Sequence, residues 1–227
     1  MKTIILIGAS SAVAKSLANI LKSNKYAVIS VSRTKPDAPH DIFYEYDVSS
    51  DEAMPEIDSC IDGLIYFPGT INLKPFRSVK QSDLELDFKI NVLGAVKSIQ
   101  SYNKNLSLSE SASIVLFSTV AVQTGMPFHA SVASSKGAIE GLTRSLAAEF
   151  APKIRVNCIA PSLTNTPMAE RLLSSPEKIE SSALRHPLKQ IGQPEDLAEM
   201  AYFLISDASK WMTGQILHLD GGMSSVK

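Results

Sequence analysis

The sequence is poor in cysteine, with only Cys60 and Cys158 among its 227 residues. Both lie beside apolar segments, which predicts buried reduced thiols and argues against a disulfide framework or a metal site. The formal net charge is only −1, so the chain lacks the basic surface that binds nucleic acid or anionic membranes. No apolar run approaches the length of a membrane span, and the run at 4–7 is about half of the ~7-residue minimum of a signal-peptide core. These absences predict a cytoplasmic protein.

The residues that are present predict an ordinary globular α/β protein, with 44% hydrophobic and 20% charged residues. Segments rich in β-branched and apolar residues alternate with stretches of helical periodicity. We expect strands at 3–7, 27–31, 42–46, 64–67, 114–117, 156–159 and 216–219. This alternation is typical of a parallel sheet covered by helices on both faces. Because no repeat or linker interrupts it, we expect one domain over residues 1–227, with two small domains as the weaker alternative.

The first strand, turn and helix form the expected nucleotide site, because open parallel sheets bind ligands beyond the carboxyl ends of their strands. Gly8 permits a tight turn, and a helix beginning near Ala12 directs its unpaired N–H groups at a phosphate. Alanines 12 and 14 replace two glycines of the usual dinucleotide fingerprint. The pattern alone is weak evidence, and a plain turn between strand and helix explains it nearly as well.

The segment 114–150 carries the expected chemistry. A buried strand ends at Ser118 and Thr119, and a loop then leads into a helix that carries Lys136 among small residues. A lysine on such a helix face, beside hydroxyls at the end of a strand, suggests a site. The alternative is that Lys136 extends into solvent, as isolated lysines usually do.

Several motifs, in their order along the chain, resemble those of the short-chain dehydrogenase/reductase family. They are Gly8-Ala9-Ser10-Ser11, Asp47-Val48, Asn91 in Asn91-Val92-Leu93-Gly94, Ile154-Arg155-Val156-Asn157 followed by Pro161, and the C-terminal segments 192–196 and 213–222. The resemblance implies a single-domain, Rossmann-type, doubly wound sheet of about seven parallel strands. It also implies hydride transfer between a nicotinamide cofactor and a small-molecule carbonyl substrate. Members usually form homodimers or homotetramers through the helices expected around 90–102 and 134–150.

The four positions that carry the family's catalysis are only partly retained. Lys136 and Asn91 are present, and Thr119 stands at the serine position. The tyrosine position, four residues before the lysine, holds Val132, which cannot donate a proton. A positioned general acid contributes roughly 10²–10⁴-fold to a rate, so another donor is needed.

Two replacement donors are open. His129 lies seven residues before Lys136, the spacing at which the enoyl reductases of the family place their tyrosine. A water held by Thr119 and Lys136 is the second candidate. The alternative for His129 is a residue at the start of a helix with no catalytic task.

The resemblance also assigns cofactor-binding positions. They are Gly8, Ser10, Ser11, Val13, Ser32, Arg33, Asp47, Val48, Pro68, Gly69, Asn91, Lys136, Pro161, Thr164 and Thr166. Because Arg33 follows the second strand where NAD-preferring members carry an acid, NADP(H) is favoured over NAD(H). The alternative is that Arg33 is a solvated charge on a loop. Pro68 removes a backbone donor near the adenosine, and Ser162 replaces a glycine after Pro161.

Two further expectations concern the connections. Only a short stretch with two prolines separates Arg33 from Asp47, so we expect the family's second helix to be missing. Residues at about 165–190 should cover the substrate. The altered positions leave a second functional class open, namely an inactive relative that binds a nucleotide or a partner.

Overall fold

The computed structural model describes residues 1–226, and all seven apolar segments form strands. They are β1 (Thr3–Ile7), β2 (Ala27–Ser32), β3 (Ile42–Glu45), β4 (Gly63–Tyr66), β5 (Ala112–Phe117), β6 (Ile154–Pro161) and β7 (Ile216–Leu219). The strands form one sheet in the order β3-β2-β1-β4-β5-β6-β7, and every neighbouring pair is parallel. The winding of the sheet therefore reverses between β1 and β4.

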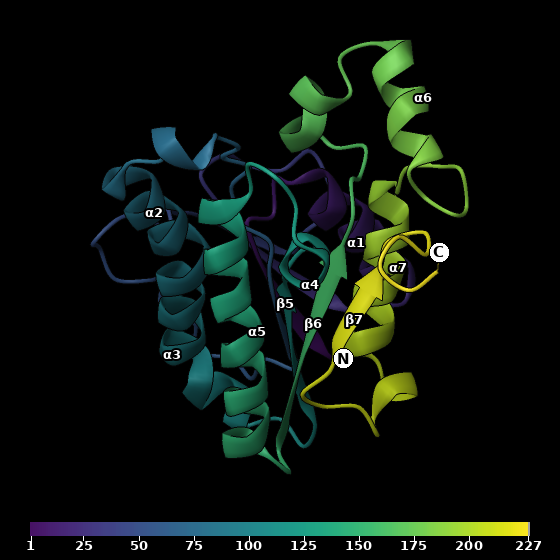
Figure 1. Cartoon of the computed structure of the whole chain (residues 1–227). Coiled ribbons are helices and arrows are strands. Elements are labelled where there is room, and N and C mark those ends of the chain that lie inside the picture. Colours follow the sequence, from purple (N-terminus) through teal and green to yellow (C-terminus); the bar gives the residue numbers. More distant parts are fainter. Residues whose placement is uncertain (227) are drawn as a thin grey trace.

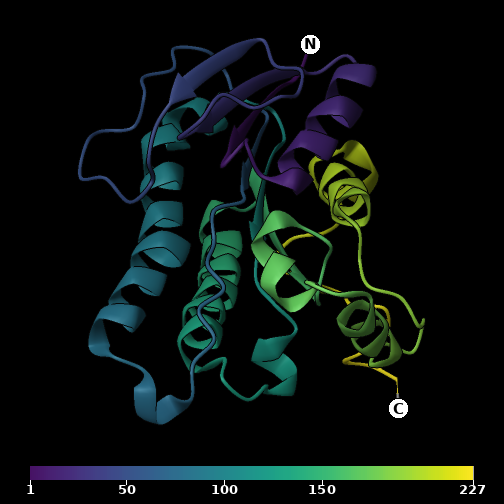
Figure 2. The ribbon, with the colours of Figure 1, turned by 90° about the horizontal axis from the view of Figure 1, so that it is seen from above.

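Helices cover both faces of this sheet, as Figures 1 and 2 show. On one face lie α3 (Gly94–Ser107) and α5 (Ala130–Phe150), and on the other α1 (Ala12–Ser23) and α7 (Pro194–Ile205). The shorter helices are α2 (Gln81–Phe88), α4 (Ala121–Thr124) and α6 (Pro176–Leu184). The 3₁₀ helices are η1 (Phe76–Ser78), η3 (Pro167–Leu172) and η4 (Asp207–Ser209), and η2 (Lys89–Leu93) is a π-helical turn. The predicted fold class is confirmed.

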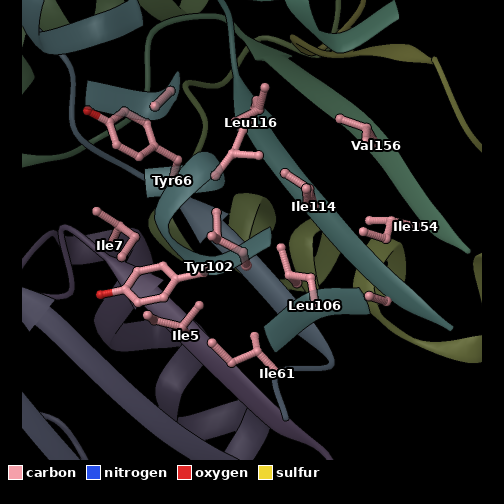
Figure 3. Packing of buried hydrophobic residues seen from close by; sticks show 14 of the residues in the cluster. Ile5, Ile7, Ile61, Tyr66, Tyr102, Leu106, Ile114, Leu116, Ile154 and Val156 are labelled. Carbon is pink, nitrogen blue, oxygen red and sulfur yellow. The ribbon is translucent and has the colours of Figure 1, made fainter. Parts of the chain in front are cut away.

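Alternation along the central strands divides the core into two layers. Ile5 and Ile7 of β1 pack toward α3, where Tyr102 lies beside them, as Figure 3 shows. The intervening side chains of β1 pack toward α1 and α7 on the opposite face. The helices are thereby fixed to a rigid sheet whose carboxyl ends are left for a ligand.

The connection between β2 and β3 contains no helix, as expected from its length and its prolines. The expectation that both cysteines are buried is wrong for one of them. Cys158 is buried in β6, but Cys60 is only half-buried because it lies in the loop before β4. Among residues 1–226, no helix has the length and apolar character needed to cross a membrane.

Candidate active site

A cavity of about 740 Å³ lies at the carboxyl ends of the central strands. Its wall includes every predicted site residue except Asn91, from Gly8, Ser10, Ser11 and Val13, through Ser32, Arg33, Asp47, Val48, Pro68 and Gly69, to Thr119, His129, Lys136, Pro161, Thr164 and Thr166. The segment 165–190, which holds η3 and α6, lies beyond the carboxyl end of β6, as Figure 1 shows. Residues spread over most of the chain thus meet around one space.

The first turn has the geometry of a phosphate site. Gly8 adopts a φ of +79°, and its N–H donates to the Val31 carbonyl at 2.7 Å. A Cβ on Gly8 would lie 2.8 Å from the Pro68 ring, so the turn admits only glycine. The Ser11 hydroxyl caps α1 by accepting from the Ala14 N–H at 3.2 Å, so it is already engaged within the chain.

The end of β2 presents a cation to the cavity. Ser32 is buried and its hydroxyl donates to the Thr34 carbonyl, whereas Arg33 is exposed at the cavity wall. Asp47 accepts from the Ser49 hydroxyl and N–H, and these bonds, with the charge of Arg33, hold its pKa below the usual range. A guanidinium at this end suits a ribose phosphate.

These features fit a dinucleotide. The glycine turn, the amino end of α1 and the Arg33 side chain lie at one end of a cavity of suitable size, and Lys136 lies at the other. Ala12, at the start of α1, also lines the cavity.

Lys136 is buried, so the alternative of a solvent-exposed lysine is wrong. Its ammonium donates to the Phe117 carbonyl at 2.9 Å, at the end of β5. Burial lowers the pKa of Lys136 from 10.5 to about 8, against the opposing charges of Cys158 and Asp87. Val132, one turn earlier on α5, is also buried and lines the cavity. The site therefore has a titratable lysine beside an apolar side chain.

Asn91 lies behind the cavity wall, in the π-helical turn η2. The Ile90 carbonyl in this turn accepts the Tyr66 hydroxyl at 2.6 Å, and a Cβ on Gly94 would collide with that hydroxyl. Such turns are frequent at functional sites. The Asn91 side-chain N–H₂ lies 3.0 Å from the Thr70 hydroxyl. Its oxygen is buried without a hydrogen-bond partner in the described part of the chain.

The two hydroxyl residues after β5 lie in different surroundings. Ser118 donates to Glu140 of α5 at 2.7 Å and is buried, whereas Thr119 is half-buried at the cavity. His129 is partly exposed, begins α5, and has its Nδ1 2.8 Å from the Pro127 carbonyl. It is thus the residue at the helix start and also part of the cavity wall, so its catalytic role stays a prediction.

The loop after β6 is held by side chains that sequence reasoning missed. The Ser162 hydroxyl lies 2.8 Å from His186 Nε2, and His186 Nδ1 lies 2.9 Å from the Ser182 carbonyl. His186 is buried, and both residues line the cavity. A carbonyl only accepts, so Nδ1 carries a proton and donates to Ser182. The contact between Ser162 and His186 ties the end of α6 to β6.

Asp87 and Thr70 were also missed. Asp87 is a buried acid at the end of α2. Thr70 lines the cavity, and its hydroxyl donates to the Asp87 carboxylate at 2.7 Å. Asp87 resembles an ordinary surface acid in the sequence. The only available signal was its spacing of four residues from Asn91, which places both on one helix face.

Comparison with known proteins identifies the family of this chain. A family model described as enoyl-(acyl carrier protein) reductase matches residues 8–224. The 3-oxoacyl-[acyl-carrier-protein] reductase FabG of Thermotoga maritima is 37% identical over 147 residues, 64% of this chain and 58% of that enzyme. The chain thus aligns with less than two thirds of that relative. L-xylulose reductase of Bos taurus is 28% identical over 96% of this chain and 94% of its own.

A solved structure of the same shape is the ligand-free aldohexose dehydrogenase of Thermoplasma acidophilum. It superposes with a TM-score of 0.89 at 27% identity, over 98% of this chain and 94% of its own. The family model covers nearly the whole chain, and the fold agrees with that of the solved structure. The chain therefore belongs to the short-chain dehydrogenase/reductase family, whose members are oxidoreductases that use NAD(P)(H).

Proposed function

We propose that this protein is an NADP(H)-dependent reductase of a carbonyl compound, or of an activated double bond, that uses a non-standard proton donor. The observation that carries the proposal is Lys136, a buried lysine that lines the dinucleotide-sized cavity beside the apolar Val132. A merely structural lysine would gain little from a position where burial lowers its pKa to about 8.

Each end of the cavity has a separate task in this proposal. Gly8 and the amino end of α1 would hold the pyrophosphate, Arg33 the 2′-phosphate, and Thr166 with Pro161 the nicotinamide. The bound cofactor supplies the hydride. Thr119 would orient the carbonyl oxygen by donating its hydroxyl proton to it.

The proton comes from Lys136 in this mechanism. Its Nζ–H bond breaks and the proton passes to the substrate oxygen that becomes the alcohol, directly or through a water held with Thr119. A lysine with a pKa of about 8 can both give up a proton and regain it near neutral pH. We favour Lys136 over His129 because His129 is partly exposed at the cavity rim.

The substrate end of the cavity favours an apolar carbonyl compound. Its wall is formed by Ile71, Leu73, Met126, Phe128, Met168 and Leu172. The flexible methionines suit substrates of more than one shape. The segment 165–190 supplies part of this wall, which is consistent with its expected role as a cover over the substrate.

The test is titration of the protein with NADPH and NADH by calorimetry, alongside Arg33→Ala and Lys136→Ala. We expect micromolar NADPH binding, at least about tenfold tighter than NADH, with the preference lost in Arg33→Ala and the affinity lowered in Lys136→Ala. Binding should be followed by a screen of apolar ketones and enones. Failure of both nucleotides to bind at millimolar concentration would overturn the reductase proposal.

The second candidate is an inactive relative that binds a nucleotide or a partner. Val132 favours it, because its buried isopropyl group occupies the tyrosine position. NADPH binding without turnover on any carbonyl or enoyl substrate would select this candidate.

A homodimer or homotetramer and a cytoplasmic location stay predictions. Leu93, in the segment around 90–102 through which family members associate, is an exposed apolar side chain, and Leu84 and Phe88 are exposed just before that segment. Light scattering of the purified protein tests the assembly.

A further inference from the structure

Asp87 is a buried carboxylate that the proposed mechanism leaves without a task. Its side chain is only 1% exposed. The Thr70 hydroxyl donates to Oδ1 at 2.7 Å and the Ser131 hydroxyl donates to Oδ2. Within residues 1–226 it forms no ion pair with a basic side chain at salt-bridge distance. An acid buried in this way is costly, and simple attachment of α2 to α5 does not require it.

The direction of the hydrogen bonds around Asp87 is determined by chemistry. An ionised carboxylate only accepts, so the Thr70 hydroxyl must donate to it. The Thr70 oxygen is then left as an acceptor, and the Asn91 amide N–H₂ faces it at 3.0 Å. The same N–H₂ lies 2.8 Å from the Asp87 carbonyl and 3.2 Å from the Ser135 hydroxyl. These acceptors hold the nitrogen of the amide on one side.

The Asn91 oxygen is thereby turned toward the cavity lysine. A Cβ built on Gly69 would lie 3.2 Å from Asn91 Oδ1 and 3.2 Å from Lys136 Nζ, so both atoms border the same glycine. The oxygen has no other partner among the described residues. An amide oxygen carries a partial negative charge, so near a buried ammonium it favours the charged form of that ammonium.

We propose that Asp87 is a positioning residue that acts through Thr70 and Asn91 to keep the Lys136 ammonium charged and directed into the cavity. The inference rests on the proposed function, in which Lys136 supplies the proton. Asp87 orients the hydrogen-bonded chain, and its own negative charge lies near the ammonium. The other groups that act on Lys136 are Cys158 of β6 and, beyond that thiol, Glu140 of α5.

Two matched variants separate orientation from simple packing. Thr70→Val and Ser131→Ala each delete one hydroxyl that donates to Asp87, but only Thr70 also contacts Asn91. Thr70→Ser keeps the hydroxyl, and Asp87→Asn removes the charge with little change in shape.

The first readout needs no cofactor. In the free protein, hydrogen exchange of the Asn91 side-chain amide, followed by NMR, should be slow in wild type, Ser131→Ala and Thr70→Ser. It should be about tenfold faster or more in Thr70→Val and Asp87→Asn. Equal exchange in Thr70→Val and Ser131→Ala would overturn the orienting role.

The second readout is the pH profile of reduction. The activity of wild type should fall as the pH rises through about 8, where Lys136 loses its proton. In Asp87→Asn and Thr70→Val this fall should move about half a pH unit or more downward, with NADPH affinity unchanged. In Ser131→Ala and Thr70→Ser the fall in activity should occur at the same pH as in wild type.

The outcomes distinguish this inference from the proposed function. If wild type binds no NADPH, the reductase proposal fails, while amide exchange still decides whether Asp87 orients Asn91. If wild type turns over but the pH profiles of all variants coincide, the inference alone is overturned. If Asp87→Asn does not fold, the two hydroxyl variants decide the question.

Discussion

The two ends of the cavity are built in different ways. At the end proposed to bind the nucleotide, here called the nucleotide end, the chain uses backbone shape and exposed charge, namely the Gly8 turn against Pro68 and the Arg33 side chain. At the proton-transfer end it uses buried polar side chains, with Asp87, Asn91 and Lys136 all buried. A site made of backbone should tolerate side-chain changes around it, such as the alanines at positions 12 and 14. A site made of buried polar groups depends on every partner.

The largest effect should follow the loss of the buried charge. Lys136→Met keeps an unbranched apolar stem and removes the ammonium, so we expect reduction to fall about 10²–10⁴-fold. The protein should remain folded because the charge itself is costly to bury. Steady-state kinetics with saturating NADPH check the prediction. Full activity in this variant would place the proton donor elsewhere in the cavity.

The same variant also tests the cost of the buried charge, through the pH dependence of the free energy of unfolding. The pKa of Lys136 is about 8 in the folded protein and 10.5 in the unfolded chain, so between these values only the unfolded chain holds the proton. Stability of wild type should therefore rise with pH across this window, by about 3 kcal/mol relative to Lys136→Met. Below pH 8 the difference between the two proteins should be constant.

Urea unfolding of both proteins at several pH values measures this difference. Comparison with the variant is needed because burial also raises the pKa of Cys158 to about 12 and so lowers the stability of both proteins at high pH. A difference that does not change between pH 8 and 10.5 would show that Lys136 titrates normally.

The nucleotide end should respond to shape instead. Gly8→Ala adds a Cβ at a φ of +79° and 2.8 Å from Pro68 Cδ. We expect a loss of about 1–3 kcal/mol of stability and weaker NADPH binding. Gly141→Ala is the matched control, because a Cβ there meets nothing within 4 Å inside α5. It should stabilise the protein by up to about 1 kcal/mol. Thermal unfolding of both variants checks the contrast, and equal effects would contradict it.

The sheet was predictable because its strands are apolar. The prediction of strand boundaries fails where a polar residue belongs to a strand. Strand β6 begins at Ile154, two residues before the predicted start, and it includes Arg155. The Arg155 guanidinium donates to the Leu204 carbonyl at 2.9 Å and to the Ser209 hydroxyl at 2.9 Å. These acceptors lie about 50 residues away, and local periodicity cannot reveal them.

The candidate site divides in the same way. Lys136, Asn91 and Thr119 could be predicted because their order along the chain follows a known pattern. Asp87 could not, since an acid on a short helix normally faces water. Its partners Thr70 and Ser131 lie 17 and 44 residues away in sequence. The packing of α2 against α5 brings Ser131 to Asp87, and the fold of the loop after β4 brings Thr70 there.

The smallest effect should come from His129, a partly exposed residue of the cavity wall. Its side chain makes no capping bond to α5 and is partly exposed, so His129→Ala should leave thermal stability unchanged. With Lys136 as the donor, we expect kcat to stay within about threefold of wild type, since a general acid would contribute far more. Steady-state kinetics across pH 6 to 9 measure it. A hundredfold loss with a normal fold would instead assign the proton to His129, and the lysine would then serve the proton-transfer end only by binding the cofactor.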